Sequence, residues 1–86
     1  MEISRSDKFK KDYQKLPKNI QKRVEKQLFF LLKDLRYPSL RVKKLRGTTD
    51  VWEARVTKFY RFLFGITNNT ILLISIGPHD EGLGKK

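Results

Sequence analysis

Residues 50–80, DVWEARVTKFYRFLFGITNNTILLISIGPHD, decide the fold that we expect for this chain. Successive side chains of a strand point to opposite faces of a sheet, so alternation of apolar and polar residues marks a half-buried strand. This stretch contains three such runs, separated by the short connections 57–59 and 68–69. The second connection is Asn68-Asn69, and asparagine tolerates the positive φ of a tight turn. The pattern therefore predicts a three-stranded antiparallel meander.

Alternation also predicts which side chains form the core and which form the opposite face of the meander. The expected core set is Trp52, Ala54, Val56, Tyr60, Phe62, Phe64, Leu72, Ile74 and Ile76. The expected opposite face carries Glu53, Arg55, Arg61 and His79, together with Ile71, Leu73, Ser75 and Gly77. Because charged residues converge on this face, we expect the functional site there.

The first forty residues predict a short edge strand and a helical hairpin. Glu2–Arg5 is the edge strand, Ser6 is a good N-cap, and Phe9, Tyr13 and Leu16 recur at helical spacing over 7–16. Pro17 ends this helix, and a second apolar stripe at Ile20, Val24, Leu28, Leu31 and Leu35 predicts a helix from about 19 to 36 or 37, stopped by Pro38. Phe29, Phe30 and Leu32 widen the stripe, so we expect this helix to be covered on more than one side.

The expected fold class is α+β: a short strand and a helical hairpin packed on a small antiparallel sheet, in the order β-α-α-β-β-β. Residues 39–47 form a basic connector, either a loop or a short extended segment. With 86 residues we expect a single domain over 1–86, with a frayed tail at 81–86.

Composition limits the kinds of site that this chain can build. It has no cysteine and one histidine, which excludes disulfides and the usual zinc clusters. No stretch resembles a signal peptide or a membrane span, so we expect a cytoplasmic location. Its 20 Lys and Arg against 9 Asp and Glu give a net charge of +11, concentrated in residues 1–46. Such a charge favours a nucleic-acid partner, and an acidic protein is the alternative.

Several short motifs, taken in order, resemble the RelE/ParE toxin superfamily. They are Leu45-Arg46-Gly47, Trp52-Glu53-Ala54-Arg55-Val56, Tyr60-Arg61-Phe62, the Asn68-Asn69 turn and Ile76-Gly77-Pro78-His79-Asp80, preceded by Leu16-Pro17 in the hairpin. The resemblance implies the toxin of a bacterial or archaeal toxin–antitoxin pair, silenced by an acidic cognate antitoxin. RelE-like members cut mRNA on the ribosome without a metal, and ParE-like members poison DNA gyrase.

The resemblance also implies roles for individual residues. Arg55 and Arg61 match basic strand positions of the nucleases, and His79 matches their arginine or histidine after the last strand. Glu53 stands where the best-known members have lysine, and no tyrosine follows His79. Arg41, Lys43, Lys44, Arg46 and Lys58 are the residues expected to hold an RNA backbone, with a solvated loop as the alternative.

The chemistry of RNA cleavage without a metal or cofactor needs a proton acceptor, a proton donor and a cation on the phosphate. Histidine titrates near neutrality, and arginine forks hold two phosphate oxygens. We therefore expect catalysis from Arg55, Arg61 and His79, with Glu53 as a general base or as the group that orients His79. The structural alternatives are an ion pair of Glu53 with an arginine and an exposed loop histidine. The functional alternatives are a ParE-like gyrase inhibitor and a binding module without activity.

Overall fold

The computed structural model describes residues 1–45, 47 and 50–78. In order, the elements are β1 (Glu2–Arg5), α1 (Asp7–Gln14), α2 (Lys18–Lys33), the 3-10 turn η1 (Pro38–Leu40), β2 (Lys43–Lys44), β3 (Trp52–Arg55), β4 (Tyr60–Thr67) and β5 (Thr70–Pro78). The five strands make one sheet in the order β1-β5-β4-β3-β2, with β1 parallel to β5 and every other pair antiparallel. The α+β class and the predicted order are confirmed, with the two-residue strand β2 as an addition and with β1 making the sheet mixed instead of antiparallel.

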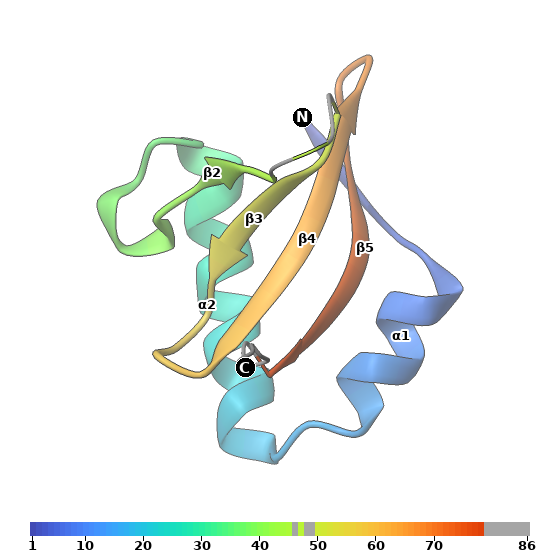
Figure 1. Cartoon of the computed structure of the whole chain (residues 1–86), viewed down its shortest axis with the longest axis vertical. Coiled ribbons are helices and arrows are strands. Elements are labelled where there is room, and N and C mark those ends of the chain that lie inside the picture. Colours follow the sequence, from blue (N-terminus) through green and yellow to red (C-terminus); the bar gives the residue numbers. More distant parts are fainter. Residues whose placement is uncertain (46, 48–49, 79–86) are drawn as a thin grey trace.

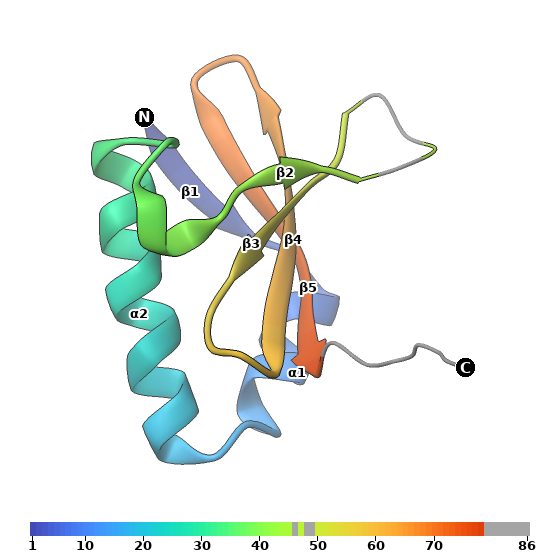
Figure 2. The same cartoon turned by 60° about the vertical axis from the view of Figure 1, so that its left-hand side comes forward.

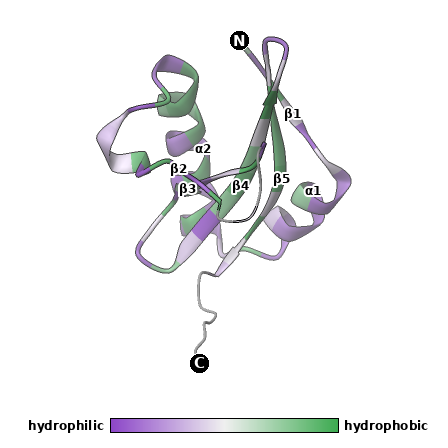
Figure 3. Ribbon diagram, turned by 45° about the horizontal axis from the view of Figure 1, so that its top comes forward, coloured by the Kyte–Doolittle hydropathy of each residue, from purple (hydrophilic) through white to green (hydrophobic). Residues whose placement is uncertain are grey.

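Helix α2 lies across one face of the sheet, and α1 lies beside β5 (Figures 1 and 2). Hydrophobic residues concentrate on β4 and β5, whereas α1 is largely hydrophilic (Figure 3). Between these layers, α2 contributes buried side chains such as Val24, Leu28 and Leu31, and α1 contributes Phe9. Phe62 and Phe64 of β4 are fully buried beneath them. The core therefore lies between the sheet and the two helices.

The predicted core face of the last strand is wrong. Ile71 and Leu73 are fully buried, while Leu72 is 39% exposed. The cause is a β-bulge: Leu63 pairs with Ser75 but Phe64 pairs with Leu73, so Ile74 is an extra residue on β5. Alternation changes phase at this residue, and only Ile76, beyond the bulge, keeps the predicted core position.

Helix α1 replaces the missing strand partner along the second half of β5. Strand β1 pairs only with residues 70–73, and beyond that point Ser6 and Asp12 take over. The Ser6 hydroxyl donates to the Ile74 carbonyl (2.8 Å) and accepts from the amide of Phe9 (3.0 Å), so one side chain caps α1 and satisfies the bulge. Asp12 Oδ2 accepts from the Ile76 amide (3.2 Å). These contacts fix the position of α1 against the sheet.

Helix α2 is shorter and more exposed than its sequence predicts. It ends at Lys33, because Asp34 is extended and Tyr37, before Pro38, is extended as well. Phe29 and Leu32 are 55% and 43% exposed, so the expectation that they would be covered is wrong within the described part of the chain. The basic connector contains both η1 and the two-residue strand β2.

Candidate active site

Glu53 lies in the middle of β3, between Lys43 of β2 and Leu63 of β4 in the sheet register. The residue is 8% exposed, and Lys43 Nζ lies 3.7 Å from its carboxylate. A carboxylate so far removed from water needs charged or hydrogen-bonding partners. Strand β2 supplies one of them.

Arg61, at the start of β4, holds the turn that joins β3 to β4. Its Nη1 donates to the carbonyls of Thr57 (2.7 Å), Lys58 (3.2 Å) and Tyr60 (3.2 Å). A guanidinium has five N–H donors, and these contacts use one of its three nitrogens. Among the described residues, none accepts a hydrogen bond from Nε or Nη2 of Arg61, so both can serve a bound anion.

Glu53 and Arg61 line the same hollow, which we call the Glu53 hollow. It encloses about 290 Å³, and Lys8, Asp12 and Ser75 also contribute to its wall. Lys8 forms an i,i+4 ion pair with Asp12 (3.0 Å). The hollow thus combines carboxylates that can accept a proton with cations that can hold an anion.

A second hollow, of about 450 Å³, lies between α2 and the β3–β4 turn. Cations from four parts of the chain line it, and we call it the basic hollow: Arg23, Lys26, Arg41, Arg55 and Lys58. None of the described residues in its wall is acidic. A concave surface with this charge suits phosphate groups.

Gln27 builds one wall of the basic hollow. Its side chain is 6% exposed, and Nε2 donates to the carbonyls of Arg55 (2.7 Å) and Ser39 (3.3 Å). The last β2–β3 pair is Lys43 with Glu53, so the Arg55 carbonyl lies beyond that ladder and takes its hydrogen bond from α2 instead. Gln27 therefore couples α2 to the end of β3.

The structure distributes the predicted site residues over both hollows. Arg55 and Arg61 are partners across β3 and β4, yet Arg55 lines the basic hollow and Arg61 lines the Glu53 hollow. Of the residues expected to hold RNA, Arg41 and Lys58 line the basic hollow, Lys43 contacts Glu53, and Lys44 is exposed on β2. His79 and Arg46 lie outside the described residues.

Four charged contributors to the hollows were not among the candidates from sequence: Lys8, Asp12, Arg23 and Lys26. Arg23 and Lys26 are three residues apart on α2 and so share one helix face, which is a signal that the sequence contains. Nothing in the sequence predicts that this face lies against the β3–β4 turn. The core assignment of Trp52 is supported by its stacking on Phe64, with ring centroids 6.2 Å apart.

A third hollow, of about 410 Å³, lies between the segment after α2 and strand β4 and includes Leu35, Val42, Trp52 and Ile66 in its wall. None of the described residues that line it is a carboxylate or an imidazole. Its described wall has no carboxylate to act with its cations, so we place the candidate active site in the Glu53 hollow.

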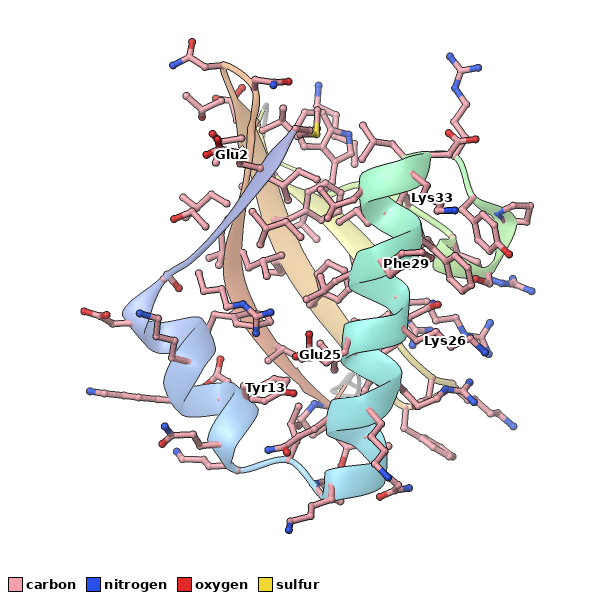
Figure 4. All side chains as sticks on the ribbon, turned by 180° about the vertical axis from the view of Figure 1, so that it is seen from behind. Glu2, Tyr13, Glu25, Lys26, Phe29 and Lys33 are labelled. Carbon is pink, nitrogen blue, oxygen red and sulfur yellow. The ribbon has the colours of Figure 1, made fainter. Side chains whose placement is uncertain are left out.

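The pKa shifts of this structure arise between the helices, where Tyr13 of α1 and Glu25 of α2 face each other (Figure 4). Arg5 donates through both terminal nitrogens to the Glu25 carboxylate (3.3 and 3.4 Å). Burial opposes the charge of Glu25, but hydrogen bonds from Tyr13 and Arg5 outweigh it and lower the pKa of the carboxyl. Burial and the neighbouring Glu25 raise the pKa of Tyr13.

In the part of the chain that the structure describes, no three histidines, cysteines or carboxylates gather as a metal site would require. No described helix is both long and apolar enough to cross a bilayer.

Comparison with known proteins identifies the family. Residues 3–83 match the family model for the ParE toxin of the type II toxin–antitoxin system parDE. No curated protein matches the sequence.

Solved structures share the fold at low sequence identity. A YoeB/ParE toxin from Agrobacterium tumefaciens superposes with a TM-score of 0.80 at 15% identity, over 93% of this chain and 100% of that one. The archaeal RelE–RelB complex from Pyrococcus horikoshii gives 0.78 at 22% identity, over 94% and 97%. The intact RelBE toxin–antitoxin complex of E. coli gives 0.74 at 21% identity, over 92% and 96%. With the family match over nearly all of its length and this shared fold, the chain belongs to the ParE toxin family of type II toxin–antitoxin systems.

Proposed function

We propose that this toxin is an endoribonuclease that cleaves mRNA in the cytoplasm, on the ribosome, and that a cognate antitoxin silences it. The observation that carries the proposal is the position of Glu53: a carboxylate 8% exposed, beside Lys43 and in one hollow with Arg61. A proton acceptor held next to two cations supplies two of the three kinds of group that metal-independent cleavage of RNA needs, and a proton donor is the third.

In the proposed reaction, Glu53 accepts the proton of the 2′-hydroxyl, and the freed oxygen attacks the neighbouring phosphorus. Arg61, through Nε and Nη2, neutralises the charge that develops on the phosphorane, and Lys43 assists from β2. The bond to the 5′-oxygen breaks and a cyclic 2′,3′-phosphate forms. His79 is the proposed donor of the proton that the leaving 5′-oxygen takes up. In this scheme Arg55 holds backbone phosphates in the basic hollow.

The test is the rate of RNA cleavage by Glu53→Gln, both on free RNA and in a translating extract. Loss of a general base lowers a rate by about 10²- to 10⁴-fold, so we expect a reduction in that range. The matched control is Glu2→Gln, which neutralises an exposed carboxylate on the edge strand β1. Thermal unfolding of both variants checks that the fold is intact. Wild-type cleavage by a folded Glu53→Gln protein would contradict the assignment.

Gyrase inhibition is the second candidate, favoured by the match to the ParE family model and by the separation of Arg55 from Arg61 into different hollows. A gyrase inhibitor needs no proton acceptor, so Glu53→Gln would leave it active. Purified toxin added to a plasmid supercoiling reaction tests this candidate. Intact RNA together with inhibited supercoiling would replace the nuclease assignment. Intact RNA and active gyrase would leave a binding module without activity.

A further inference from the structure

The turn between β3 and β4 presents one aromatic ring to solvent on a rigid support. Phe59, at its tip, is 67% exposed. The backbone around it is closed by hydrogen bonds from the amides of Val56 (2.9 Å) and Thr57 (3.3 Å) to the Tyr60 carbonyl. The Thr57 hydroxyl accepts from the Phe59 amide (3.2 Å), and Arg61 binds three carbonyls of the same turn. A backbone held in this way loses little conformational freedom when a ligand stacks on the ring that it carries.

The turn also lies between the two hollows. Thr57 and Lys58 line the basic hollow, and their carbonyls hold the guanidinium of Arg61, which lines the Glu53 hollow. This turn therefore offers a linear ligand a direct route from one hollow to the other. Phe59 is adjacent to Lys58 in the chain, and Lys58 Nζ lies 5.9 Å from the centre of its ring.

The two sides of this path differ in what they can bind. The basic hollow has five cations and no acidic residue among the described residues of its wall, so it suits consecutive phosphates. An exposed aromatic ring suits the flat face of an unpaired base, because stacking tolerates any base. Together they match a single strand, which offers phosphates on one edge and unstacked bases on the other.

We propose that single-stranded RNA crosses the β3–β4 turn with one base stacked on Phe59 and with its backbone in the basic hollow, where Arg23 and Lys26 of α2 join Arg55. This inference rests on the proposed function, because it takes RNA as the substrate, and it adds the route that the RNA follows.

The first test measures the affinity of an uncleavable 2′-O-methyl RNA oligomer by fluorescence anisotropy. Removal of a stacking ring weakens single-strand binding by about 5- to 100-fold, and we expect Phe59→Ala to do so and Phe59→Trp to retain the affinity. The matched control is Phe29→Ala on α2, because Phe29 is also exposed (55%) and has Lys33 Nζ 4.8 Å from its ring, but lines neither hollow. Equal affinities of wild type and Phe59→Ala would overturn the path over the turn.

The second test measures how the same affinity depends on salt. Each phosphate contact contributes about 0.7 to the slope of log K against log salt for a single strand. The double variant Arg23→Ala, Lys26→Ala should therefore reduce the slope by about 1.4. The control is Lys18→Ala, Lys22→Ala, which removes two exposed cations of α2 from outside the basic hollow. Phe59→Ala should lower the affinity without changing the slope. Equal slopes for the two double variants would overturn the role of the hollow.

Poly-glutamate of the same charge as the RNA oligomer tests an acidic protein partner instead. We expect weaker binding than to RNA and no effect of Phe59→Ala. The proposal would be overturned if poly-glutamate bound as tightly as RNA and if both ligands responded to the Arg23 and Lys26 changes but not to Phe59→Ala. The basic hollow would then be assigned to a protein partner. Because these measurements use uncleavable RNA, they are independent of the Glu53→Gln result. A protein that binds along this path but does not cleave would refute the nuclease activity alone.

Discussion

Replacement of Gln27 by leucine should destabilise the protein, although Gln27 is buried and leucine is apolar. The substitution keeps the volume nearly unchanged, but it removes the donor to the Arg55 carbonyl (2.7 Å) and the contacts with Ser39. An acceptor left without a partner in this part-buried position costs up to about 3 kcal/mol. Ser39 is exposed, so water can replace its hydrogen bond, and the Arg55 carbonyl accounts for most of the loss. We therefore expect a reduction of about 2 kcal/mol in the free energy of unfolding.

Thermal unfolding followed by circular dichroism measures this effect. For a domain of this size, 1 kcal/mol shifts the midpoint by about 4–8 °C, so Gln27→Leu should lower Tm by about 8–16 °C. Gln14→Leu is the control, because Gln14 is an exposed glutamine of α1. A fall in Tm no larger than that of the control would refute the claim that Gln27 satisfies the end of β3.

Further substitutions test other parts of the fold. Ser6→Ala removes the cap of α1 and the donor to the bulge carbonyl, and should lower the free energy of unfolding by about 2 kcal/mol in a urea titration; a loss below about 0.5 kcal/mol would refute the double role. Gly47→Ala should lower the free energy of unfolding by about 1 kcal/mol, because φ is +84° at this position. Gly77→Ala is the control, because Gly77 has open space around it and should tolerate the change. Equal urea midpoints for the two variants would contradict this. Because the pKa of Glu25 is lowered from its ordinary value of 4.5, the charged carboxylate stabilises the fold above pH 4.5, and this stabilisation is lost at lower pH. Tm should therefore fall less on acidification in Glu25→Gln than in wild type. The raised pKa of Tyr13 predicts the opposite dependence of stability on pH. The free energy of unfolding should fall as the pH rises above 10, and it should fall less in Tyr13→Phe.

Most of the architecture could be predicted because its signals are local. Apolar spacing, the Ser6 cap, the prolines and the Asn68-Asn69 turn each act within a few residues, and Asn68 has the positive φ (54°) that its turn requires. The face of β5 could not be predicted in the same way. The apolar Ile74 looks like any other residue of the strand core, and its extra position appears only once β4 is aligned beside β5.

The candidate site shows the same division between local and long-range information. Alternation along β3 and β4 placed Glu53 and Arg61 together, and they do line one hollow. The same reasoning grouped Arg55 with them, but Arg55 is the last residue of β3 and lines the hollow next to α2. The contribution of α1 through Lys8 and Asp12 depends on how a helix docks at the end of β1, which no pattern within either segment specifies.

The parallel pairing of residues 2–5 with residues 70–73 also governs the order in which the sheet can form during synthesis. Strand β1 is translated before β5, its hydrogen-bonding partner, and Glu2 pairs with Thr70, a residue 68 positions later. Helix α1 depends on the same late strand through Ser6 and Asp12. The nascent polypeptide should therefore lack a finished sheet until β5 has left the exit tunnel.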